Sequence, residues 1–264
     1  MHRAARAVIE GVGRDKSIKN GQLVLCGYRG EGPGADTMIS HYAIGDIDAM
    51  SKQALAWAET GYNVYSARCI YTGLKPKQRG THKQVAAVFG LPVDLDADKG
   101  NAFGFDQLPV LPSQVPITSR VPAKNAQATY FLAKAITISE AKILARALCD
   151  LVGDADGATA DVNHVWRIAG TLNVPKAVKI KRGRPSAPQR VDPDLHGTGD
   201  AVDPEVLASA LGVTLSAPKA APPRQDHGPA EVKQDGRGWA GEGFDTMAPE
   251  AQQRAAMKRL LEAL

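Results

Sequence analysis

Cysteine is scarce in this chain: three residues among 264 (Cys26, Cys69 and Cys149), with no Cys-x-x-Cys spacing. This excludes a disulfide-stapled scaffold and a zinc ribbon. Aromatic residues make up only 5% of the chain, so we expect an aliphatic, alanine-rich core. Hydrophobic residues still reach 44%, which is enough for a globular core and excludes a chain that is disordered throughout.

Long apolar runs are also absent, and none approaches the ~18 residues that a membrane span needs. The first residues, MHRAARAVIEGVGRDK, carry charge without an apolar stretch followed by a small-residue cleavage site. We therefore expect no secretory signal and a cytoplasmic protein. The length allows one large domain or two small ones.

Acidic residues are missing between Val162 and Val191. The same stretch carries seven positive charges, on Arg167, Lys176, Lys179, Lys181, Arg182, Arg184 and Arg190. Such a stripe suits a polyanion, for example a nucleic acid. A solvated, locally disordered basic segment is the alternative interpretation.

The hydrophobic pattern predicts short strands at 23–26, 38–44, 62–68, 88–96, 117–121 and 126–132, with a further strand at 178–180. Helices are predicted from an N-cap at Asp46 to about Thr60, and from a cap at Ser139 to about Leu151. A short helix is also expected to begin at Asp161. Strands interleaved with a few helices indicate an α+β fold rather than regular βαβ winding.

Composition shifts after about Asp192, where Pro, Ala, Gly and Asp dominate. We expect an N-terminal extension at 1–21, a folded catalytic domain at 22–192 and a largely disordered linker at 193–246, which holds a short helix at 203–211. Residues 247–264 are expected to form an amphipathic helix. Its apolar face suggests either the truncated start of a further domain or a helix that dimerises or docks on the core.

The first motif that could carry chemistry is VDLDAD, in which Asp94 and Asp96 end a predicted strand. Side chains at i and i+2 of a strand share one face, roughly 7 Å apart, so both carboxylates point together while Leu95 points into the core. Paired carboxylates suit Mg²⁺, which prefers hard oxygen ligands and substrate phosphates. Turn chemistry at a strand exit is the alternative, and Asp98 fits a turn better than a metal site.

Two further motifs follow. ITSRVPAKNAQATY places hydroxyls, Arg, Lys, Asn and Gln between two strands, which suits a phosphate cradle as well as an ordinary hairpin loop. DVNHVWRIAGTLNVPK carries an acid, an Arg, a Gly-Thr turn and a Lys, which could complete a metal site and hold a triphosphate. His164 lies between the acid and the Arg of this last motif, and we assign it a structural role.

Taken in order, the three motifs resemble the archaeo-eukaryotic-type primase (prim-pol) superfamily, especially the primase domains of plasmid RepB-type and phage replication proteins. VDLDAD resembles the hydrophobic-DxD motif, and ITSRVPAKNAQATYFL resembles the T-S-then-H/Q-x-x-Y motif. DVNHVWRIAGTLNVPK resembles the signature of an acid followed by R-x-P-G-T-x-N-x-K. The resemblance spans about Leu23 to Arg190. Gln127 stands where many members have His, and Ala169 stands where Pro is usual.

This resemblance implies an RRM-like catalytic core, an antiparallel or mixed sheet backed by helices. It implies nucleotidyl transfer from NTPs or dNTPs on a single-stranded DNA template. It also implies that Asp94, Asp96 and Asp161 hold two Mg²⁺ or Mn²⁺ ions, with Asp154 and Asp156 as rivals for the third position. Residues implied to contact the triphosphate are Ser119, Lys124, Gln127, Arg167 and Lys176. Residues implied to follow the template backbone are Lys179, Lys181, Arg182 and Arg184.

The leading hypothesis is therefore a DNA primase or primase-polymerase of a plasmid, phage or integrated element. The departures at Gln127 and Ala169 motivate an alternative, a catalytically degenerate module that binds single-stranded DNA. A different metal-dependent phosphotransfer enzyme, such as a nuclease, shares only the DxD pattern. The terminal helix resembles the start of the small helical domain that often links primase cores to a replicative helicase, which makes a helicase a possible partner.

Overall fold

A computed structural model describes residues 2–14, 18–97, 104–122, 124–153, 157–192 and 197–215. The chain divides into two compact units, Met1–Ala217 and Pro218–Leu264. The helix expected at 247–264 and most of the expected linker lie outside the described residues. The proposed domain boundaries stay predictions.

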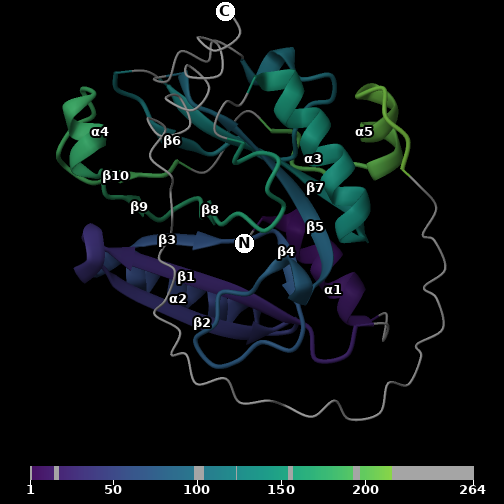
Figure 1. The fold of residues 1–264 in the computed structure, drawn as a ribbon, viewed down its shortest axis with the longest axis horizontal. Coiled ribbons are helices and arrows are strands. Elements are labelled where there is room, and N and C mark those ends of the chain that lie inside the picture. Colours follow the sequence, from purple (N-terminus) through teal and green to yellow (C-terminus); the bar gives the residue numbers. More distant parts are fainter. Residues whose placement is uncertain are drawn as a thin grey trace, which may run out of the picture. The chain divides into compact units, whose positions relative to one another are not determined.

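An antiparallel sheet organises the first unit (Figure 1). Its path is β6-β7-β5-β4-β1-β3-β8, and β2 pairs with β1 beside this path. The strands are β1 (Gln22–Arg29), β2 (Asp36–Ala43), β3 (Asn63–Ser66), β4 (Cys69–Tyr71), β5 (Val85–Leu95), β6 (Ile117–Ser119), β7 (Asn125–Ile136) and β8 (Trp166–Arg167). A second, two-stranded sheet joins β9 (Leu172–Asn173) to β10 (Gln189–Arg190).

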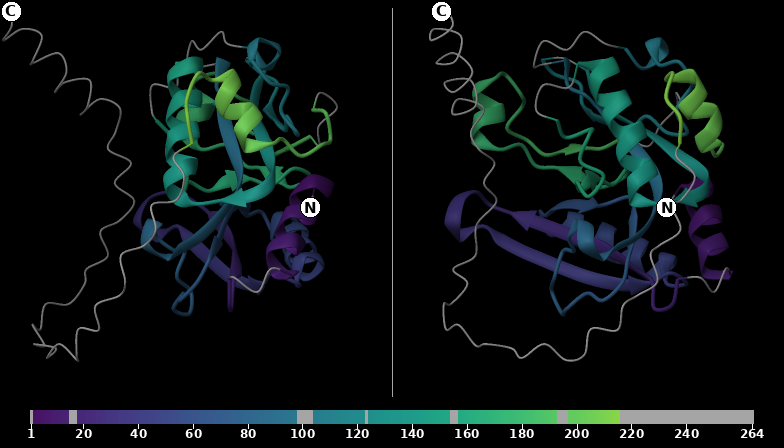
Figure 2. Two further views of the ribbon diagram at one scale, coloured as in Figure 1. Left: turned by 90° about the vertical axis from the view of Figure 1, so that its right-hand side faces the viewer. Right: turned by 45° about the vertical axis from the view of Figure 1, so that its right-hand side comes forward.

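The helices are α1 (Arg3–Arg14), α2 (Ile47–Glu59), α3 (Ile138–Val152), α4 (Ala177–Lys181) and α5 (Pro204–Ala210). Single 3₁₀ turns lie at Gly32–Gly34, His82–Gln84 and Phe105–Gln107. α3 packs on β5, while α1 packs on β7 and β5 (Figure 2). Two apolar clusters result, one containing the buried face of α3 and the other the buried faces of α1 and α2. This mixture of strands and helices confirms the predicted α+β class.

The N-terminal stretch contributes to the core. Ala5 and Ile9 of α1 are fully buried in the cluster that also contains Met50 of α2 and Phe131 of β7. Burial of an Ile side chain contributes about 1.5–3 kcal/mol to the stability of the fold. The segment expected as an N-terminal extension therefore helps to cover one face of the β5–β7 pair.

Three predicted local features differ in the structure. The cap of α3 is Thr137, whose hydroxyl accepts from the Glu140 N–H while the Glu140 carboxylate accepts from the Thr137 N–H. Ser139 lies inside the helix, because the reciprocal Thr-x-x-Glu arrangement satisfies two free N–H groups at once. Asp46 does stand at the N-cap of α2, but its side chain makes no capping hydrogen bond.

The expected strand at 178–180 is the helical turn α4 instead. The Val-Lys-Ile-Lys alternation mimics a strand, yet Val178 and Ile180 are both exposed. The Ala177 N–H donates to the Glu31 carboxylate at 2.6 Å, which satisfies a free donor at the helix start. A strand here would need a neighbouring edge to pair with, and this contact favours the helical turn.

The expected short helix after Asp161 is also absent from this described segment. The Asp161 carboxylate accepts from the Asn163 N–H at 2.9 Å, the Asx-turn geometry that competes with helix formation. Trp166 and Arg167 then form β8, which pairs with Ser66 and Tyr65 of β3. Among the described residues, no helix is long and apolar enough to cross a membrane.

Candidate nucleotidyl-transfer site

The DxD pair, Asp94 and Asp96, lies where β5 ends. Asp94 stands directly opposite Gln127 of β7, so the two side chains share one face of the sheet. Leu95 is 4% exposed and belongs to the apolar cluster that contains α3, on the other face, as predicted. Antiparallel pairing thus places an acid and an amide side by side, although they are 33 positions apart in the sequence.

The backbone of Asp94 is fixed from the side of β5 away from β7. Its N–H donates to the hydroxyl of Thr159 at 3.0 Å, and Thr159 is 2% exposed. A buried bond of this kind costs about 1–3 kcal/mol when one partner is removed, since the other is left unsatisfied. The segment that contains Thr159 and Asp161 is therefore anchored beside the DxD pair.

Asp96 lies between two cations of the basic segment, which we define as Lys179–Arg190. Its carboxylate is 3.8 Å from Lys179 Nζ and 3.8 Å from the Arg184 guanidinium. The side chains are little exposed, 15% for Asp96 and 9% for Arg184. Partial burial strengthens each pair relative to an exposed one. The structure thus brings Asp96 of the DxD pair and the predicted basic segment together.

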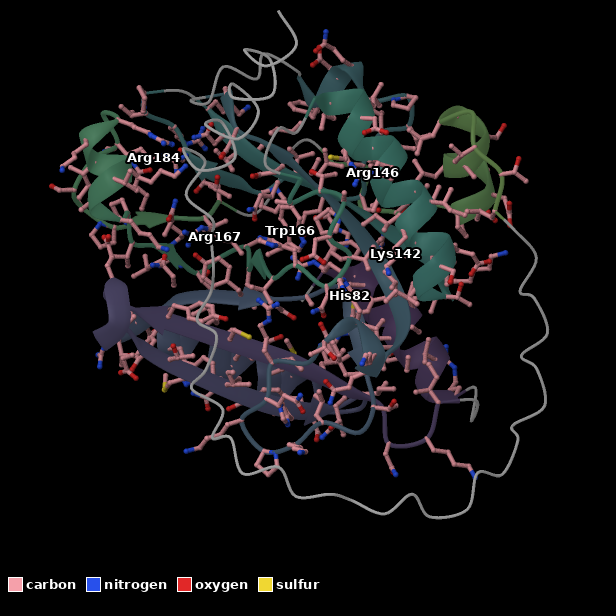
Figure 3. All side chains as sticks on the ribbon, in the orientation of Figure 1. His82, Lys142, Arg146, Trp166, Arg167 and Arg184 are labelled. Carbon is pink, nitrogen blue, oxygen red and sulfur yellow. The ribbon has the colours of Figure 1, made fainter. Side chains whose placement is uncertain are left out.

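Arg167 of β8, labelled in Figure 3, contacts Gln127 through its backbone, while its side chain turns to β3. Its N–H donates to the Gln127 side-chain oxygen at 3.2 Å. Its guanidinium donates to Asn63 at 2.6 Å and lies 4.8 Å from the centre of the Tyr65 ring. A guanidinium over an aromatic face is a favourable cation–π arrangement. Arg167 is therefore oriented by β3 on one side and tied to β7 on the other.

Asn63 is a site residue that sequence reasoning missed. Its amide donates to the Val174 carbonyl at 3.0 Å, and its oxygen accepts from the Val174 N–H at 2.8 Å as well as from Arg167. A single buried amide therefore fixes both the chain after β9 and the guanidinium. The available signal was an Asn inside an apolar strand pattern, where this residue type is depleted.

The other residues that were predicted to contact the triphosphate make contacts outside the DxD pair. Ser119 is 3% exposed, and its hydroxyl accepts from the Asn125 amide at 2.8 Å. Because Ser119 and Asn125 are register partners in β6 and β7, both lie near the same strand ends as the DxD pair. Lys124 is exposed and lies 5.8 Å from the centre of the Phe105 ring. Lys176 is exposed at the N-cap of α4.

The remaining predicted DNA contacts, Lys181 and Arg182, are exposed where α4 ends. Their side chains therefore face solvent, whereas Lys179 and Arg184 turn toward Asp96. The basic segment thus has an inner part that contacts the acid and an outer part that is free to face a polyanion.

Asp161 makes different contacts from the DxD pair. Its carboxylate bonds His82 Nε2 at 2.9 Å, and its side chain is 40% exposed. Across the described ranges, no group of three His, Cys, Asp or Glu side chains lies close enough together to hold a metal ion. Asp154 and Asp156, the rivals for the third position, lie outside the described residues. The DxD pair itself offers the hard oxygen donors that Mg²⁺ and Mn²⁺ prefer.

No protein-family model and no curated protein matches this chain. Among solved structures, it is similar to the AEP domain of the cyanophage S-2L primase-polymerase (TM-score 0.46, 12% identity, covering 78% of this chain and 96% of that one). It is also similar to primase RepB' (TM-score 0.46, 17% identity, 97% of this chain and 68% of that one). A third is the catalytic domain of primase RepB' in complex with initiator DNA (TM-score 0.43, 19% identity, 78% of this chain and 94% of that one).

Proposed function

We propose that this protein is a DNA primase or primase-polymerase of a plasmid, phage or integrated element. One observation carries the proposal. Asp94 of the DxD pair lies opposite Gln127 of β7, whose side chain accepts from the Arg167 backbone N–H, and Asp96 pairs with Lys179 and Arg184 of the basic segment. Nucleotidyl transfer needs acids that hold divalent ions and basic groups that neutralise phosphate, both within reach of one triphosphate.

In this proposal, Asp94 and Asp96 hold Mg²⁺ or Mn²⁺, which when bound activates the attacking hydroxyl and stabilises the leaving pyrophosphate. The third carboxylate comes from the segment that Thr159 anchors beside Asp94, either Asp161 or one of its rivals. Asp161 would have to exchange its contact with His82 for this role.

The basic side chains have different proposed roles in binding the triphosphate and the template. Arg167 and Lys176 are proposed to neutralise the triphosphate, together with Ser119, Lys124 and Gln127. Lys179 and Arg184 pair with the Asp96 carboxylate. We propose that they contact phosphate oxygens when a nucleotide binds. Lys181 and Arg182 are proposed to contact the template backbone, in a manner that carries no sequence information and weakens with salt.

A primer-synthesis assay tests the proposal. Purified protein with Mn²⁺ or Mg²⁺, a single-stranded template and labelled NTPs or dNTPs should make short oligomers, and Asp94→Asn should reduce synthesis to background. Asp150→Asn is the matched control, because Asp150 is an exposed carboxylate on α3 that pairs with Arg146 one turn away. Synthesis by Asp94→Asn within about tenfold of the wild type would contradict the proposed metal site.

A second candidate function is a binding module for single-stranded DNA without catalysis. The observation that favours it is the pairing of Asp96 with two cations, together with the lack of a three-ligand group across the described ranges. It predicts salt-sensitive DNA binding that Asp94→Asn leaves unchanged, with no synthesis by the wild type. Activity that degrades DNA without NTPs would instead indicate a nuclease.

A further inference from the structure

A cavity of about 330 Å³ lies beside the candidate site but is not part of it. Its walls come from Ala5 of α1, Met50 and Ala54 of α2, Phe89 of β5 and Phe131 of β7. The turn that follows β8 closes another side. The volume lies at the lower end of the range for small-molecule sites, and the walls are mostly apolar, as is usual for such sites.

Among the described residues that line this cavity, Arg68, between β3 and β4, is the one whose side chain is charged at any ordinary pH. Its guanidinium donates to the Ser66 carbonyl at 3.1 Å and to the Arg167 carbonyl at 3.4 Å. Its Nε is buried and has no hydrogen-bond partner. No Asp or Glu is among the described residues that line the cavity.

Arg68 is half-buried, and two carbonyls accept from its guanidinium, but no carboxylate among the described lining residues balances its charge and its Nε has no partner. Buried charges in proteins are normally paired, and a buried donor without a partner costs about 1–3 kcal/mol. Burial lowers the pKa of Arg68 to about 10, so the group is still a cation at neutral pH. An anion inside the cavity would offset the charge of this guanidinium.

We propose that this cavity binds a small apolar molecule that carries one compact anionic group, such as a carboxylate, which Arg68 holds while the apolar walls enclose the body. The anionic group follows from the permanent charge of Arg68 and from the absence of acids among the described lining residues. The apolar body is required by the side chains of α1, α2, β5 and β7. The proposal does not depend on the function proposed above.

The cavity also adjoins the candidate site. The Arg167 peptide group donates through its N–H to Gln127 and accepts through its carbonyl from Arg68. Ile168, Ala169 and Thr171, which follow, line the cavity. A bound molecule would therefore lie against the chain that positions Arg167.

Titration calorimetry with two pairs of probes tests the proposal. Each pair has one shape and differs only in charge: 2-naphthoate with 2-naphthamide, and octanoate with octanamide. The wild type is expected to bind at least one carboxylate about tenfold or more tightly than its amide, because the charge-assisted hydrogen bonds to Arg68 are lost with the amide. This comparison needs no variant.

Variants then locate the site. Arg68→Met keeps the apolar stem and should remove the preference for the carboxylate, whereas Arg68→Lys should keep part of it. Arg146→Met, on the exposed face of α3, is the control and should bind like the wild type. Equal affinity for carboxylate and amide, binding of none of the four probes, or an unchanged preference in Arg68→Met would each overturn the proposal.

Discussion

Replacing Asn63 should both destabilise the protein and release Arg167. Asn63 is 8% exposed and takes part in three hydrogen bonds, two with the Val174 backbone and one with the Arg167 guanidinium. In Asn63→Ala, three partly buried groups lose their partner: the N–H and the carbonyl of Val174 and the Arg167 guanidinium. At about 1 kcal/mol for each bond to the backbone and about 1.5–3 kcal/mol for the bond to a charged group, the free energy of unfolding should fall by about 3–5 kcal/mol.

Asn63→Asp separates the two roles of this residue. The carboxylate still accepts from the Val174 N–H and from Arg167, so only the bond to the Val174 carbonyl is lost. We therefore expect Asn63→Asp to be clearly more stable than Asn63→Ala. Urea denaturation followed by circular dichroism measures both, and the Ala variant should lower the midpoint by about 1–2 M.

Nucleotide binding gives the second readout. If Asn63 orients Arg167 for phosphate, Asn63→Ala should weaken triphosphate binding in the part of the protein population that remains folded. Exposed Asn20→Gly, at a residue with positive φ, is a control that changes an asparagine away from the site. A loss of less than about 1 kcal/mol in Asn63→Ala would refute the reasoning, because the bond to the charged Arg167 guanidinium alone is expected to contribute about 1.5–3 kcal/mol.

Three further predictions concern stability. Gly80→Ala should cost about 3 kcal/mol in a denaturation experiment, since its φ is +95° and a Cβ would lie 2.7 Å from the buried Tyr71 ring; Gly73→Ala, with φ +67° and no atom within 4 Å, should cost only the backbone strain of about 1–2 kcal/mol. Thr137→Ala should cost about 1 kcal/mol through loss of the α3 cap, and an unchanged midpoint would contradict the capping box. Burial raises the pKa of the Cys69 thiol to about 12, so the unfolded chain ionises this thiol at lower pH than the folded one. Stability should therefore fall as pH rises above about 9, and Cys69→Ala should weaken that dependence.

Much of the candidate site could be predicted from local patterns. Strand periodicity places Asp94 and Asp96 on one face and Leu95 on the other, and the structure has Leu95 in the core. The strand that contains Gln127 was also predicted, and antiparallel pairing of β5 with β7 then puts Gln127 opposite Asp94. The roles of these residues in metal and nucleotide binding stay predictions.

Other parts of the site could not be predicted this way. Asn63 and Arg68 stand in a region whose sequence reads as an ordinary strand, and their partners lie about 100 positions further along. The His82–Asp161 contact likewise joins two loops. No periodicity links such residues, because their proximity follows from how β3, β4 and β8 pack.

The sequence by itself determined the α+β class, most strands, and the grouping of acids and bases into motifs, because periodicity, turn residues and charge runs act over a few positions. Only the tertiary structure decided that Lys179 and Arg184 would flank Asp96, that the Val-Lys-Ile-Lys stretch would be helical, and that Arg68 would face a cavity with no acid among its described lining residues. These outcomes depend on long-range packing and on which buried charges find partners, and neither is encoded in any local window.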